Sequence, residues 1–249
     1  MLAFLAEHRF ALAAQLARLA GTSARSAGLR LAALRRAGLV RAARPLRHDA
    51  SAWSITRRGL AVCESALGVP RPIDLASYRH DVGVAWLAAG ARRGIFGELS
   101  EVVSERTMRS EDRRADRPAD APAHGVRLGH GESAGLHYPD LSVVTASGHR
   151  VAFELELSTK SPRRRERILA AYAGDPRIDL VVYLVPTRAA GEAIARSAAR
   201  VGALDTVRVQ RLHWAGGRAP GEPARGRTAR RSATARERTA PRRASEASR

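Results

Sequence analysis

The stretch Val151-Ala-Phe-Glu-Leu-Glu-Leu-Ser-Thr-Lys160 decides the fold expected for this chain. Apolar residues alternate in it with polar ones, and a period of two predicts a β-strand. Glu154, Glu156, Ser158 and Lys160 would share one face of that strand, and the apolar residues would pack on the other. Lys160 is the one lysine in the chain. The stretch therefore predicts a row of acids over an apolar floor, with a lysine at its end.

A second strand is expected directly upstream, over residues 136–145, joined by a tight turn to a strand over residues 149–157. A three-residue loop Ala146-Ser147-Gly148 would place its glycine in the left-handed conformation and Asp140 opposite Glu154 on one face. A two-residue loop would instead place Asp140 opposite Leu155. A site that needs clustered carboxylates therefore predicts the three-residue loop, or an equivalent odd-length one.

Clustered carboxylates suit Mg²⁺, because a hard cation prefers oxygen ligands and lowers the pKa of its bound water. Asp140, Glu154 and Glu156 form the candidate catalytic set, in which Asp140 and Glu154 are the candidate metal ligands. Glu105 is a candidate fourth carboxylate, although its neighbour Arg106 would equally neutralise it in a surface pair.

Lys160 is expected to fall short of this metal. Four residues of extended strand cover about 13 Å, at roughly 3.3 Å each, and a lysine side chain reaches about 6 Å. Only a bend after Ser158 would bring the ammonium back. A contact with a substrate phosphate, or plain solvation at the strand end, is expected instead. His80, on a predicted helix beside Asp81, is expected to be a hydrogen-bonded or surface histidine rather than a catalytic one.

Residues 1–67 have the element order of a winged helix-turn-helix. Leucines at helical spacing predict helices, the third of which begins after Gly21-Thr22-Ser23 and ends at Gly38. Short strands over residues 39–41 and 53–55 flank a polar segment typical of a wing. The alternative is a small basic domain used for protein contact. The third helix and the wing would place the following residues on DNA: Arg25, Ser26, Arg30, Arg35, Arg41, Arg44, Arg47 and His48.

Residues 68–72 are expected to be a linker, and residues 73–214 a second unit with the order α, β, β, β, α, β, α, β. The fold class is thus α+β, with a long mobile loop over residues 109–133. Ser161-Pro162 predicts the start of a basic helix, in which Arg163 and Arg164 are candidate phosphate contacts together with Lys160. Residues 215–249 hold no large apolar residue and are expected to be a disordered, Arg-rich tail that adds affinity for phosphates.

The formal net charge of +19 favours a polyanionic partner, and double-stranded DNA is the expected one, ahead of an anionic membrane. No stretch approaches the roughly 18 uninterrupted apolar residues of a membrane span. The N-terminus lacks the pattern of a signal peptide, so a cytoplasmic location is expected. Cys63 stands alone, which excludes an intrachain disulfide and a cysteine-based zinc cluster.

Tyr138-Pro-Asp140, followed by Glu154-Leu-Glu156 in this order of elements, resembles the PD-(D/E)XK nuclease fold of restriction-endonuclease-like enzymes. With the phrases Leu5-Ala-Glu-His-Arg-Phe10 and Ser104-Glu-Arg106, residues 1 to about 214 are similar to the replication-relaxation family of actinobacterial plasmids and integrated elements. The resemblance implies that Asp140, Glu154 and the carbonyl of Leu155 bind the metal. Glu156 departs from the family pattern, which expects a lysine at that position to help activate water.

Two functions stay open at this point. The first is a Mg²⁺-dependent DNA endonuclease or nickase of a plasmid or integrated mobile element, targeted by the winged helix. The second is a non-catalytic plasmid replication or transcription regulator with a degenerate nuclease core. A structural role in a larger replication or conjugation complex is a third reading. A homodimer and replication or conjugation proteins are the protein partners considered.

Overall fold

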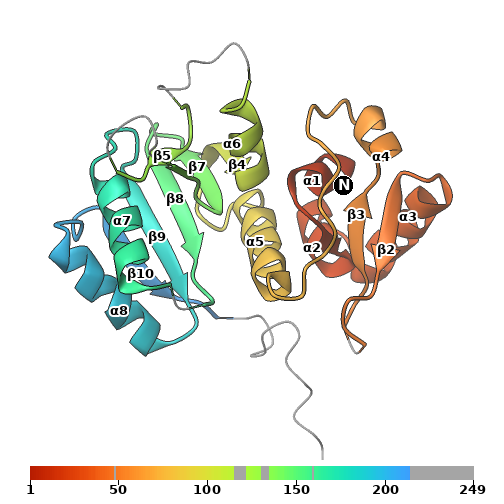
Figure 1. Ribbon diagram of the computed structural model, residues 1–249. Coiled ribbons are helices and arrows are strands. Elements are labelled where there is room, and N and C mark those ends of the chain that lie inside the picture. The colour runs from red at the N-terminus through yellow and green to blue at the C-terminus, as the bar shows by residue number, and fades with distance from the viewer. Residues whose placement is uncertain (48, 115–121, 130–134, 159, 214–249) are drawn as a thin grey trace, which may run out of the picture.

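A computed structural model of the chain describes residues 1–47, 49–114, 122–129, 135–158 and 160–213. It is a mixed α and β protein with an N-terminal unit (residues 1–67) and a core unit (residues 73–213), which lie side by side in Figure 1. None of the helices in these ranges combines the length and the apolar character needed to cross a membrane. His48, residues 115–121 and 130–134 of the expected loop, and the tail from residue 214 lie outside the described residues.

The N-terminal unit folds around a small antiparallel sheet in the order β1-β3-β2. Ser23 caps the third helix as expected, because its Oγ accepts from the N–H of Ser26 at 3.1 Å. The pair of residues that forms β1 was too short to predict. The elements are α1 (Leu2–Glu7), β1 (Ala11–Leu12), α2 (Ala13–Ala20), α3 (Ala24–Arg36), β2 (Val40–Ala43), β3 (Ala52–Ile55) and α4 (Arg57–Val62).

The core unit has a five-stranded sheet in the order β10-β9-β8-β7-β4. Strands β4, β7 and β8 are antiparallel neighbours, whereas β8, β9 and β10 run parallel. The expected order is present, with α6 and the β5–β6 pair added. The elements are α5 (Tyr78–Ala91), β4 (Leu99–Ser104), α6 (Glu105–Glu111), β5 (Val126–Arg127), β6 (Leu136–His137), β7 (Leu141–Thr145), β8 (Arg150–Leu155), α7 (Pro162–Ala173), β9 (Leu180–Val185), α8 (Arg188–Arg200) and β10 (Val207–Arg211).

The expected loop over residues 109–133 contains parts of two short elements that the sequence did not predict. Helix α6 continues to Glu111, because Ser104 caps it and Met108 is fully buried beneath it. Further on, β5 pairs with β6. The expected strand over residues 136–145 is split into β6 and β7, with Pro139, which has no N–H to donate to a ladder, between them. Short elements with one buried side chain give too weak a period to be seen in the sequence.

Helix α5 belongs to the hydrophobic cores of both units. Ala85 and Ala88 of α5 share a buried cluster with Leu16 of α2 and with Phe153 of β8. The opposite face of the sheet is covered by α7 and α8 in a separate cluster, which includes Tyr172. Figure 1 shows α5 between the N-terminal unit and the sheet, with α7 and α8 on the other side. The sheet is therefore covered by helices on both faces, and α5 attaches it to the N-terminal unit.

Candidate functional site

The register of the β7–β8 hairpin is the one that the candidate site requires. Leu141 pairs with Phe153. The N–H of Thr145 donates to the carbonyl of His149 at 2.9 Å. Gly148 has φ +87°, the left-handed conformation expected of the last loop residue. The three-residue loop Ala146-Ser147-Gly148 is therefore confirmed, and the register brings Asp140 level with Glu154.

The side chains of these two acids nevertheless turn in different directions. Asp140 lies one residue before β7, and its Oδ2 accepts from the N–H of Leu155 at 2.7 Å and contacts His80 Nε2 of α5 at 3.0 Å. Glu154 contacts α7 instead, on the opposite face of the sheet. Alternation of side chains holds only within a regular strand, and Asp140 lies outside one. The directly opposed carboxylate pair expected from the sequence is not formed.

Glu154 is buried, with 3% of its surface exposed. Its Oε1 accepts from the hydroxyl of Tyr172 at 2.6 Å and lies 2.7 Å from His137 Nε2. Burial raises the pKa of Tyr172 well above its ordinary value, and the charge of Glu154 adds to the shift. The hydroxyl of Tyr172 therefore stays protonated and donates a hydrogen bond to the carboxylate of Glu154. Neither Tyr172 nor His137 was a candidate in the sequence, since their contacts come from packing between segments far apart.

Lys160 lies among the acids, which corrects the expectation that it falls short. Its Nζ contacts Glu156 Oε2. Burial works against its charge, but Glu154, Glu156 and Asp140 together raise the pKa of Lys160. The expectation was wrong because it assumed an extended strand, whereas β8 ends at Leu155. Lys160 thus neutralises the acid row from within.

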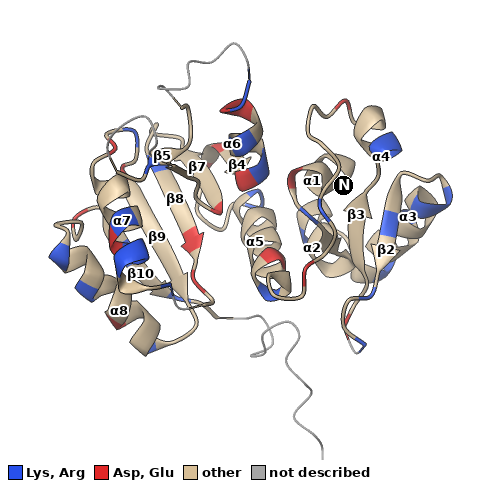
Figure 2. Cartoon of the chain, in the orientation of Figure 1, with Lys and Arg blue, Asp and Glu red and all other residues tan. Residues whose placement is uncertain are grey.

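Glu156 has a buried oxygen that no hydrogen bond satisfies. The residue is 6% exposed. Its Oε2 is taken by Lys160, while Oε1 has no hydrogen-bond partner in the described part of the chain. An unpartnered buried carboxylate oxygen is costly, so this atom is the part of the acid row best prepared to accept a ligand. Figure 2 shows the acids at the end of β8 as a red segment in a mostly uncharged sheet.

His80 is the site residue that sequence reasoning undervalued. Burial lowers its pKa, but hydrogen bonds to Asp140 and then Asp81, with the charges of both, raise it to about 10. Burial of Asp140 opposes ionisation in turn, and the hydrogen bond and charge of His80 hold the pKa of Asp140 below its ordinary value. The two residues therefore form an ion pair near neutral pH. His80 and Asp140 are 60 residues apart, and the signal in the sequence was limited to a histidine on a predicted helix.

Glu105 pairs with Arg109, one helical turn along α6, at 2.7 Å. It does not pair with Arg106, the neighbour considered in the sequence. Glu105 and Asp140 both line one cavity between the two units. Glu105 is therefore neutralised by an arginine, which was the alternative to a role in the site. The arginine is Arg109 rather than Arg106.

The donor set of the acid row suits a hard cation, because it consists of carboxylate oxygens. The oxygen of Glu156 that lacks a partner also fits a metal ligand. Among the residues described, however, no group of three or more His, Cys, Asp or Glu side chains is gathered closely enough to hold a metal ion. In this structure the carboxylates instead contact His80, His137, Tyr172 and Lys160.

The candidate DNA contacts of the N-terminal unit lie on its surface. Arg25, Arg30 and Arg35 are exposed along α3, and Arg44 and Arg47 are exposed after β2. Ser26 is less available, because its Oγ lies 2.9 Å from the Oγ of the capping residue Ser23. In the core unit, Arg163 and Arg164 are exposed in the first turn of α7. Figure 2 shows these basic stretches in blue on α3 and α7.

Comparisons with known proteins returned nothing: no family model, no curated protein and no solved structure matches this chain.

Proposed function

We propose that the chain is a DNA-binding protein of a plasmid or integrated mobile element, with a Mg²⁺-dependent endonuclease or nickase site at Asp140, Glu154, Glu156 and Lys160. One observation carries the proposal: Lys160 contacts Glu156 and lies close enough to Glu154 and Asp140 for their charges to raise its pKa. A lysine among acids at the end of two neighbouring strands is the constellation that the PD-(D/E)XK resemblance implies. Here the lysine is Lys160, which lies four residues after Glu156.

The N-terminal unit would bind double-stranded DNA as a winged helix-turn-helix. Support comes from α3, which follows α2 after a short turn and presents exposed arginines, and from the basic segment between β2 and β3. Arg163 and Arg164 at the start of α7 would contact phosphates, because a helix N-terminus attracts anions.

In this proposal Asp140, Glu154 and Glu156 would hold Mg²⁺, and the side chains of Asp140 and Glu154 would turn toward the ion from their present contacts with His80 and Tyr172. Bound there, the ion would lower the pKa of an attacking water and neutralise charge on the phosphate. Lys160 would pair with Glu156 and stabilise the negative charge of a nearby phosphate. Before the ion binds, His80 would hold the carboxylate of Asp140 through its hydrogen bond. Tyr172 and His137 would do the same for Glu154.

Nicking of supercoiled plasmid in Mg²⁺ or Mn²⁺ tests the enzyme. Asp140→Asn removes one charge from the proposed site, and Asp205→Asn removes one from an exposed carboxylate far along the chain. We expect nicking to fall at least about a hundredfold in the first variant, the scale of losing one electrostatic contact in an active site, and to stay unchanged in the second. Equal nicking by wild type and Asp140→Asn would reject this site.

A second function is favoured by the pairing within the acid row. Each of the three carboxylates already has a cation or hydrogen-bond donor, and no metal cluster is gathered in the described residues. This state suits a non-catalytic plasmid replication or transcription regulator. That function predicts footprints at a defined DNA site without cleavage, and no heat of Mn²⁺ binding that depends on Glu154 when wild type is compared with Glu154→Gln. Homodimers and contacts with replication or conjugation proteins belong to either proposal.

A further inference from the structure

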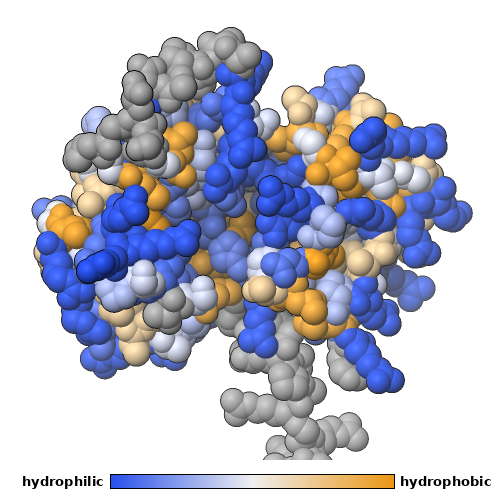
Figure 3. Space-filling view, in the orientation of Figure 1, coloured by the Kyte–Doolittle hydropathy of each residue, from blue (hydrophilic) through white to orange (hydrophobic). Residues whose placement is uncertain are grey.

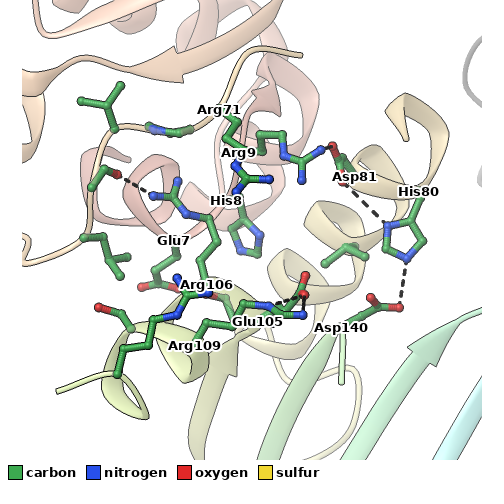
Figure 4. A pocket seen from close by; sticks show the side chains of 18 of the residues that line it. Glu7, His8, Arg9, Arg71, His80, Asp81, Glu105, Arg106, Arg109 and Asp140 are labelled. Carbon is green, nitrogen blue, oxygen red and sulfur yellow. Dashed lines mark hydrogen bonds and ion pairs between the residues drawn. The ribbon is translucent and has the colours of Figure 1, made fainter. Parts of the chain in front are cut away.

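A cavity of about 710 Å³ lies between the N-terminal unit and the core unit. Its lining comes from the end of α1, the segment before α5, α5 itself and α6. Figure 4 shows the labelled side chains around it, and Figure 3 shows hydrophilic surface on both sides of this boundary. The cavity joins the two short sequence phrases of unassigned role, Leu5-Ala-Glu-His-Arg-Phe10 and Ser104-Glu-Arg106. Residues almost 100 positions apart thus meet at one place.

The lining is dominated by arginine. Every acid in it already has a cationic partner: Glu7 pairs with Arg92, Asp81 with Arg9, Glu105 with Arg109 and Asp140 with His80. Arg106 and Arg71 also line the cavity, and neither forms an ion pair with a carboxylate among the described residues. The cavity therefore carries positive charge that the protein itself does not neutralise.

Two buried nitrogen atoms in this lining have no hydrogen-bond partner in the described part of the chain. One is Nη1 of Arg106, whose Nη2 donates to the carbonyl of Gly68 at 2.5 Å. The other is Nε2 of His8, a residue that is only 5% exposed. Burial lowers the pKa of Arg106, and the charge of Arg9 lowers it further, so the two guanidinium groups repel one another in this space. A buried donor without a partner is destabilising, and an anion bound here would both accept from the donors and offset the like charges.

We propose that this cavity is a phosphate-binding pocket, in which Arg106, Arg9 and Arg71 surround the anion and His8 Nε2, when it carries the imidazole proton, donates a hydrogen bond. Guanidinium groups suit phosphate because they present paired N–H donors in a plane. Arg71 is exposed and reaches the cavity from the linker, whereas Arg106 approaches from α6. Three segments of the chain therefore supply the positive groups.

The phosphate has two possible sources, a nucleic acid strand or a free nucleotide. Asp140 lines the same cavity, so a strand held there would lead toward the proposed cleavage site. Identifying the ligand as a DNA strand rests on the proposed function, but the phosphate site itself does not. Binding measured in EDTA keeps the two apart, since no metal and no cleavage are involved.

Equilibrium binding to the full chain tests the pocket. The probes are inorganic phosphate, dAMP, and a single-stranded oligonucleotide with either a 5′-phosphate or a 5′-hydroxyl. Arg106→Gln removes the central guanidinium. Arg71→Gln removes an exposed one and is not expected to disturb folding. Arg196→Gln, on the exposed surface of α8, is the matched control for loss of one positive charge. Thermal melting followed by circular dichroism verifies that each variant is folded.

For each phosphate probe that wild type binds, we expect Arg106→Gln and Arg71→Gln each to lower the affinity by about tenfold or more, the effect of losing a charged hydrogen bond. The affinity of Arg196→Gln should stay within twofold of wild type. A loss confined to the oligonucleotides identifies a strand as the source, and a loss with dAMP and inorganic phosphate identifies a free nucleotide. Binding of all probes that is equally strong in Arg71→Gln and Arg196→Gln would overturn the pocket. If the Arg71→Gln variant still cleaves DNA in that case, the proposed nuclease function would stand without the phosphate pocket.

Discussion

The acid row at the end of β8 and the arginine-lined cavity between the units both gather charged side chains around buried polar atoms that lack a partner among the described residues. In the acid row, Asp140, Glu154 and Glu156 are each countered by a side chain of the same molecule, and one oxygen of Glu156 is left over. In the cavity, the acids are countered and arginine is in excess. The protein's own contacts offset most of the charge of the first cluster, whereas the second keeps an excess of positive charge that an anion from outside would neutralise.

Glu154→Ala is the strongest test of whether the protein's own contacts within the acid row stabilise the fold. The change leaves the hydroxyl of Tyr172 and the ring of His137 without their acceptor in a buried place, so we expect a loss of about 4 kcal/mol in the free energy of unfolding. Glu192→Ala, which breaks an exposed pair with Arg188 on α8, is the control and should cost less than about 0.5 kcal/mol. Urea unfolding measures both. Similar losses in the two variants would mean that Glu154 is not a structural anchor.

His8 tests the cavity through acid pH. Burial, with the charges of Arg92 and Arg106, lowers its pKa from 6.5 to about 3. The unfolded chain therefore binds a proton at a pH where the folded one does not, and the stability contributed by neutral His8 is present above pH 6.5 and lost as pH falls toward 3. We expect wild type to lose on the order of 3 kcal/mol more than His8→Phe between pH 7 and pH 3. Parallel curves of unfolding free energy against pH would contradict the burial of a neutral ring.

The ion pair between His80 and Asp140 behaves in the opposite sense. The pKa of His80 is raised to about 10, so its stabilisation is complete below pH 6.5 and is lost as pH rises through 10. Because a third of the His80 side chain is exposed, we expect only on the order of 1 kcal/mol between pH 7 and 10, relative to His80→Gln. An NMR titration of the ring gives the pKa directly. In Asp140→Asn it should fall by several units, and an unchanged value would remove the pair.

The smallest effect is expected away from both clusters. Arg188→Ala breaks the same exposed pair on α8 and should change the unfolding free energy by no more than about 0.5 kcal/mol. Its measurement sets the size of an ordinary surface pair against which both clusters are judged. A larger loss would show that an exposed pair contributes more than about 0.5 kcal/mol in this chain, and the losses at both clusters would then be compared with that larger value.

Local features of the chain were predictable. The glycine of Ala146-Ser147-Gly148 set the hairpin register, and Ser161-Pro162 set the start of α7, because turns and caps depend on a few neighbouring residues. The contacts of His80 and Tyr172 were not predictable, since each depends on how a helix packs on the sheet. Lys160 was misjudged for a related reason: its position depends on where β8 ends, and spacing along a sequence does not give that point.

Helix α5 is packed into the cores of both units at once, with α2 on one side and the sheet on the other. A support shared in this way leaves little freedom for one unit to rotate against the other. If α3 recognises a DNA sequence and Asp140 marks the point of cutting, α5 would keep a fixed distance between them. The nick would then fall a constant number of base pairs from the recognised sequence, whatever bases lie between.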